Sequence, residues 1–80
     1  MDALGKYLKE QRQAKGITFQ EIEQITKINQ AYLRALEEEQ YHFLPAPIFT
    51  IGFLKQYALC VGLDPEDVIL RYRPALQSRG

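Results

Sequence analysis

The side chains that could carry out acid–base or metal chemistry in this 80-residue chain are few and isolated. His42 is the single histidine, and it lies between two aromatic residues in a segment interrupted by prolines. Cys60 is the single cysteine, so no disulfide forms within the chain, and one cysteine with one histidine does not complete a four-ligand zinc set. We expect the glutamates at 37–39 to form a solvated helix end, whereas a general acid needs a cleft. We therefore expect no catalytic residue, no metal site and no cofactor, which excludes an enzyme.

Aromatic residues in segment 47–62 are the second set of candidates, and the chemistry they offer is apolar contact with a partner. Successive helical residues lie about 100° apart, and this spacing gives the segment two apolar faces. The first face is an ordinary core stripe made of Ile51, Leu54, Ala58 and Val61. Phe49 and Phe53 lie on the second face at an i,i+4 spacing, with Tyr57 between the two faces.

One small core cannot cover both faces of this segment. We therefore expect Phe49 and Phe53 to form a protein-binding patch, because aromatic anchors dominate the energetics of interfaces and exposed apolar patches mark interaction sites. The alternative is that the loop at 41–44 or a following helix folds back and covers Phe53 and Tyr57.

Chain breakers and capping signals divide the sequence into five helical segments that must position these side chains. We expect helices over about residues 3–15, 18–25, 29–39, 47–62 and 64–73, the last ending before Pro74. The pattern predicts an all-α fold, a five-helix bundle that contains a phage-repressor-like helix-turn-helix. Residues 1–73 form this domain, and residues 74–80 form a tail that leads toward a juxtamembrane segment outside this chain.

The second and third helices have clear start signals. Thr18 and Glu21 have the spacing of a capping box, in which each side chain satisfies a backbone N–H near the other residue. Ile22 and Ile25 are the residues of this helix that we expect to point inward. Asn29 can cap the third helix.

These two short helices, joined by a tight turn, have the layout of a DNA-binding helix-turn-helix. Its candidate DNA contacts are the two capping residues, a lysine in the turn and two residues of the third helix with side chains suited to base edges: Thr18, Asn29, Lys27, Gln30 and Arg34. A sequence-specific transcription regulator is therefore the alternative function.

The charge pattern argues against DNA as the main partner. The chain has a formal net charge of zero, whereas nucleic-acid-binding domains carry a basic patch or stripe. The other outward positions expected on the third helix offer little to a base: Ala31, Ala35 and Glu38. The glutamates at 37–39 would repel phosphates within a Debye length of about 8–10 Å.

A set of residues spread over nearly the whole chain resembles the cytoplasmic domain of the RodZ family of bacterial cell-shape membrane proteins. The residues that carry the resemblance are Leu4-Gly5, Leu8, Arg12, Lys15-Gly16-Ile17-Thr18, Thr26-Lys27-Ile28, Tyr32-Leu33, Ala35-Leu36-Glu37, Leu44-Pro45, Gly52-Phe53-Leu54, Tyr57-Ala58 and Gly62-Leu63-Asp64-Pro65. The string from 44 to 65 is the most specific part, and a turn without glycine at 26–28 is usual in this family.

The resemblance implies an adaptor that ties the actin-like filament protein MreB to the cytoplasmic face of the bacterial inner membrane. In the family, aromatic residues of the fourth helix contact MreB, and they fall on Phe49 and Phe53, with Tyr57 one turn on. It also implies a transmembrane helix after the domain, with Arg71, Arg73 and Arg79 beginning a basic juxtamembrane stretch. The chain itself has no run of about 20 apolar residues, so this membrane helix would lie outside it.

Overall fold

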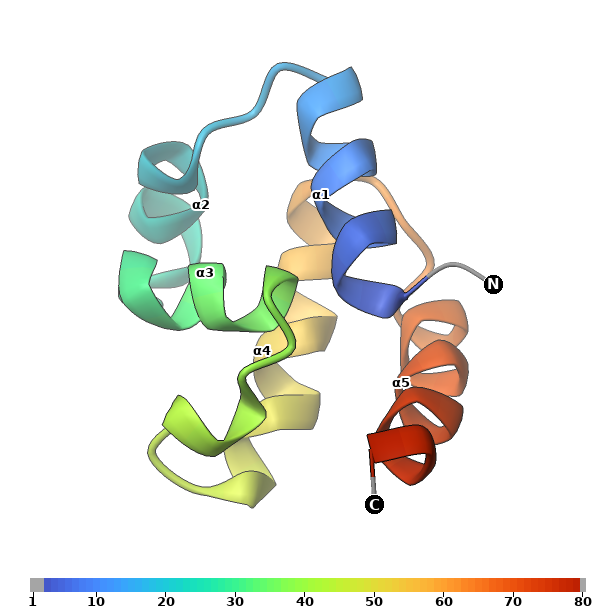
Figure 1. Cartoon of the computed structure of the whole chain (residues 1–80). Coiled ribbons are helices and arrows are strands. Elements are labelled where there is room, and N and C mark those ends of the chain that lie inside the picture. The colour runs from blue at the N-terminus through green and yellow to red at the C-terminus, as the bar shows by residue number, and fades with distance from the viewer. Residues whose placement is uncertain (1–2, 80) are drawn as a thin grey trace.

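Helices make up nearly all of the regular structure of this chain. The computed structural model describes the backbone of residues 3–79 and the side chains of residues 3–72. In chain order the elements are α1 (Leu4–Ala14), α2 (Phe19–Thr26), α3 (Gln30–Glu37), the 3-10 helix η1 (Tyr41–Phe43), α4 (Pro47–Cys60) and α5 (Pro65–Arg79) (Figure 1). The expected all-α, five-helix fold with a helix-turn-helix is confirmed.

The start signals of α2 and α3 act as the sequence predicts. The Glu21 N–H donates to the Thr18 hydroxyl at 3.1 Å, and the Thr18 N–H donates to the Glu21 carboxylate at 3.0 Å. The Asn29 side chain accepts from the Ala31 N–H at 2.7 Å. Between the two helices, Lys27 adopts a left-handed conformation with φ 65°, which ends α2 in a position where glycine is the usual residue.

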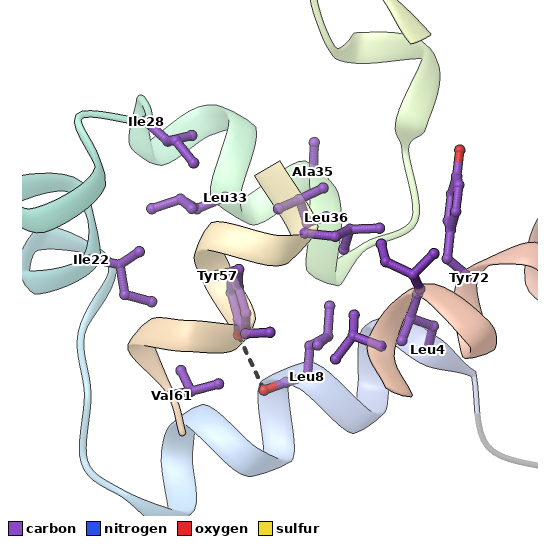
Figure 2. Close-up of a cluster of buried hydrophobic side chains, with 14 of the residues drawn as sticks. Leu4, Leu8, Ile22, Ile28, Leu33, Ala35, Leu36, Tyr57, Val61 and Tyr72 are labelled. Carbon is purple, nitrogen blue, oxygen red and sulfur yellow. Dashed lines mark hydrogen bonds between the residues drawn. The ribbon is translucent and has the colours of Figure 1, made fainter. Parts of the chain in front are cut away.

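Helix α4 runs through the middle of the molecule, with α2 and α3 on one side and α5 on the other (Figure 1). Its inward residues join side chains from every other α-helix in one continuous core (Figure 2). The fully buried members from α4 are Leu54, Tyr57 and Ala58, and Val61 follows directly after the helix. The expected core stripe is therefore confirmed in these positions, while Ile51 is only half-buried. Val68, Ile69 and Tyr72 of α5 are buried as expected.

Two inward or outward assignments from the sequence are wrong. Ile25 was expected in the core but is 72% exposed, because α2 is short and Ile28 in the following turn is buried instead. Ala35 was expected on the outward face of α3 but is 2% exposed. The chain after α3 doubles back as η1 against that helix, and the Gln40 N–H donates to the Ala35 carbonyl oxygen. This return leaves α3 with a narrower outward face than a free helix would have.

The expected end of the last helix before Pro74 is also wrong, because α5 continues to Arg79. A proline removes one i→i−4 hydrogen bond from a helix interior, and here that loss does not end the helix. The side chains of residues 73–80, including Arg73 and Arg79, lie outside the described part. The role of residues 74–80 as a tail leading to a membrane segment stays a prediction.

Helices α1 and α3 approach each other closely at Gly5. A Cβ atom on Gly5 would overlap the backbone carbonyl oxygen of Glu37. The Gly5 N–H donates to the Glu39 carboxylate at 3.1 Å, so a residue after α3 caps the start of α1. Ala3, the residue in the N-cap position of α1, makes no side-chain capping bond of its own. Contact between α1 and α3 therefore depends on the absence of a side chain at position 5.

We expect Gly5→Ala to destabilise the domain by about 2–3 kcal/mol, because the new methyl group meets backbone that cannot move aside independently. Gly52→Ala is the matched control, since Gly52 lies inside α4 with open space around it and should gain about 0.5–1 kcal/mol. Urea unfolding followed by circular dichroism measures both changes. Equal effects of the two substitutions would contradict the close approach at Gly5.

Candidate protein-binding site

Four aromatic side chains form a continuous row that crosses from α4 over α3 to η1. Phe49 and Phe53 are stacked with ring centroids 6.0 Å apart, and Phe53 is stacked on Tyr32 at 5.9 Å. Tyr32 in turn meets the edge of Phe43 at 5.9 Å. We call these four residues the aromatic row. Sequence reasoning missed Phe43 and Tyr32 as members, because only folding brings η1 and α3 next to α4.

The two ends of the aromatic row are open to solvent. Phe49 is 50% exposed and Phe43 is 53% exposed, while Phe53 and Tyr32 in the middle are half-buried and pack against the core. Ile48, next to Phe49 in the chain, is 82% exposed. The inner rings thus support the outer rings, and the surface that results is apolar and already ordered before any partner arrives.

Tyr57 does not belong to this surface. Its side chain is fully buried, with an exposed fraction of 0%, so its predicted place among the partner-contacting aromatic residues is wrong. The reason is helical geometry: each i,i+4 step advances about 40° around the axis, so that Tyr57 lies about 80° from Phe49. Two such steps rotate the aromatic series from the open face of α4 into the core.

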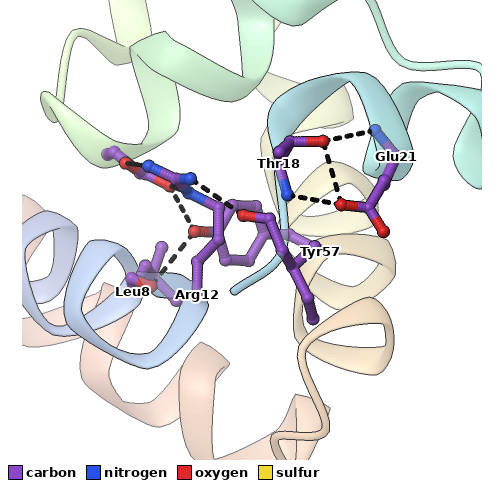
Figure 3. Close-up of polar contacts among 7 residues, drawn as sticks. Leu8, Arg12, Thr18, Glu21 and Tyr57 are labelled. Carbon is purple, nitrogen blue, oxygen red and sulfur yellow. Dashed lines mark hydrogen bonds and ion pairs between the residues drawn. The ribbon is translucent and has the colours of Figure 1, made fainter. Parts of the chain in front are cut away.

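The buried hydroxyl of Tyr57 is part of a polar network that joins α1, α3 and α4. It donates to the Leu8 carbonyl oxygen at 3.1 Å (Figure 2), and it also contacts the Glu37 carboxylate. The Arg12 guanidinium binds the same carboxylate through Nε at 2.7 Å and Nη2 at 3.3 Å. The guanidinium also donates to the Ile17 carbonyl oxygen at 3.0 Å. Figure 3 shows Arg12, Tyr57 and Leu8 of this network.

The protonation states of this network are held in place by burial and by the charge of Glu37. Burial raises the pKa of Tyr57, and its hydrogen bond to the Glu37 carboxylate raises it further. The same carboxylate raises the pKa of Arg12. Phe19 covers the outer side of the guanidinium, with the Arg12 Cζ atom 4.2 Å from the ring centroid. The network is therefore a structural element, and it fixes the rotation of α4 that presents Phe49.

Of the five candidate DNA-contacting residues, three have side chains engaged within the chain. Thr18 and Asn29 bond backbone N–H groups as helix caps, and the Gln30 amide donates to the Glu23 carboxylate at 2.8 Å. Lys27 and Arg34 are exposed. DNA binding by the other three side chains would require breaking these hydrogen bonds. These three polar side chains therefore stabilise the fold, and Lys27 and Arg34 remain as accessible DNA-contact candidates.

This arrangement, with two capped helices of a helix-turn-helix packed against a central fourth helix, matches a known class of domain. Residues 7–68 match the protein family described as helix-turn-helix domain, and the chain belongs to that family. Cytoskeleton protein RodZ of Streptococcus pneumoniae is 35% identical over 69 residues, which are 86% of this chain and 25% of that protein. Membrane protein YmfM of Bacillus subtilis, which is described as uncharacterized, is 35% identical over 57 residues, or 71% of this chain and 20% of that protein.

A solved structure of YmfM from Staphylococcus aureus has the same fold. It matches with a TM-score of 0.86 at 30% identity and covers 92% of this chain and 90% of that one. That protein is described as a membrane protein with a suggested DNA-binding role. The chain spans a quarter or less of the length of its curated relatives.

These relatives confirm the RodZ-like resemblance, and the chain is homologous to the matched regions of RodZ and YmfM. The helix-turn-helix family to which the chain belongs is a non-enzymatic family. Within the residues that the structure describes, no helix is long and apolar enough to cross a membrane.

We expect Tyr57→Phe to lower the free energy of unfolding by about 2 kcal/mol, because the Glu37 carboxylate loses a donor in a buried site. Tyr32→Phe is the matched control, since no hydrogen bond involves the Tyr32 hydroxyl among the described residues, and its loss should cost less than about 0.5 kcal/mol. Denaturant unfolding distinguishes the two. If Tyr57→Phe were as stable as the wild type, the buried network would not hold α4 as described.

Proposed function

We propose that this domain is a non-enzymatic cytoplasmic adaptor that binds the actin-like filament protein MreB through Phe49 and Phe53. The observation that carries the proposal is the stacked pair of phenylalanines on α4, of which Phe49 is 50% exposed and Phe53 is partly buried against the core. Its likeness to a cytoskeleton protein supports a filament protein as the partner.

The geometry of the pair favours tight binding. An interface residue that must be ordered on binding costs conformational entropy, and rings already stacked on a supporting ring avoid most of that cost. Phe53 rests on Tyr32 and the core, while Phe49 rests on Phe53. Phe49 is therefore the better contact residue, and Phe53 both contacts the partner and holds Phe49 in place.

We also propose that the parent protein anchors this domain to the inner membrane through a transmembrane helix that follows it. The support is the description of both YmfM relatives as membrane proteins. In this arrangement α5 connects the domain to the membrane.

Replacing Phe49 by alanine should weaken binding to purified MreB at least about 30-fold, as expected for an aromatic hot spot worth about 2 kcal/mol. Circular dichroism should show an unchanged fold, because half of the ring is already exposed. Leu59→Ala is the matched control: Leu59 is 63% exposed on the same helix, about 15 Å further along the axis. The affinity can be measured by sedimentation with MreB filaments or by fluorescence anisotropy.

The double variant Phe49→Ala with Phe53→Ala tests the whole pair. Unchanged affinity in a folded double variant, or an equal loss with Leu59→Ala, would overturn the assignment of the site.

Sequence-specific DNA binding is the rival function, and its support is the description of the YmfM structure together with the exposed Arg34 on α3. We expect no complex with duplex DNA in a gel-shift series at about 50 mM salt and protein concentrations up to about 1 µM. A salt-sensitive complex that Arg34→Ala weakens and Phe49→Ala leaves unchanged would establish the DNA-binding function instead.

A further inference from the structure

A hollow lies directly beyond Phe43, at the end of the aromatic row farthest from Phe49. Its volume is about 160 Å³. Phe43 supplies one wall, and the other lining residues come from α3 and the segment after it: Ala31, Arg34, Ala35, Glu38 and Gln40. The hollow exists because two alanines stand where larger residues would fill the space between α3 and η1.

The size and charge of the hollow define what fits in it. The hollow is open to solvent rather than enclosed, and its volume leaves room for one side chain of a partner. Arg34 of α3 and Glu38, which directly follows that helix, both line the hollow and carry opposite charges, so the lining has no net formal charge. An uncharged group therefore suits this hollow better than a phosphate or a carboxylate.

We infer that this hollow is a socket for one apolar side chain of the same protein partner that docks on Phe49, and that Phe43 is the second anchor of the interface. The inference rests on the proposed function. It follows from the continuity of the surface, because the aromatic row leads without a break from Phe49 to the wall of the socket.

The matching exposure of the two end rings supports this assignment. Phe43 and Phe49 are exposed to nearly the same extent, 53% and 50%, and each rests on a ring that packs against the core. A partner that buries only Phe49 would leave Phe43 and the socket open to water. A partner that spans the row buries both anchors and places one apolar side chain beside Ala31 and Ala35.

Filling the socket without removing any existing contact is the sharpest test. Ala31 is exposed on α3 and lines the socket, and leucine is a good helix former, so Ala31→Leu should fold normally and occupy the hollow itself. We expect it to weaken MreB binding at least tenfold, and Phe43→Ala to do the same by removing the anchor. Ala31→Ser keeps the hollow open and should bind with less than a threefold change.

The control for an added surface leucine is Ala14→Leu, at an exposed alanine that ends α1, which should bind as the wild type does. If Phe49→Ala weakens binding while Ala31→Leu and Phe43→Ala do not, the socket is overturned and the proposed function survives. If the wild type does not bind MreB, or Phe49→Ala has no effect, both fall. Circular dichroism and urea unfolding of each variant confirm that losses of affinity are not losses of fold.

Discussion

The bidentate contact between Arg12 and Glu37 is the interaction on which the rest of this domain depends. The Glu37 side chain is only 4% exposed, so its charge is stabilised by the guanidinium and by the Tyr57 hydroxyl rather than by water. An uncompensated charge in such a place would cost several kcal/mol. Because the three side chains come from α1, α3 and α4, satisfying this one carboxylate sets the mutual orientation of three helices. The open face of α4 is a consequence of that orientation.

Local signals in the sequence were enough to predict where most helices begin. The capping box at Thr18 and Glu21 and the cap at Asn29 act over three residues or fewer, so no knowledge of the fold was needed. The i,i+4 pair of Phe49 and Phe53 was also visible. The burial of Tyr57 was not, because its hydroxyl partners lie 49 and 20 residues away in the chain. Helical angles alone placed it between two faces, and only the network decides between them.

The helix-turn-helix also supports the apolar surface of this domain. In this chain, three of the five candidate DNA-contacting side chains are engaged with the protein's own backbone and with Glu23, while Lys27 and Arg34 are exposed. The apolar surface lies on α4 and η1 instead. The same geometry that presents α3 to a groove in other proteins here supports Tyr32, and through it the aromatic row.

The bond between the Gly5 N–H and the Glu39 carboxylate makes the first turn of α1 dependent on a residue that follows α3. The first turn of this helix has no local cap, so in isolation it would fray, and it becomes complete only when the end of α3 is in place. Amide hydrogen exchange at Gly5 would then occur through opening of the α1–α3 contact rather than through local unwinding. The start of α1 and the end of α3 therefore belong to one cooperative unit. A substitution that removes the Glu39 carboxylate would also destabilise the first turn of α1.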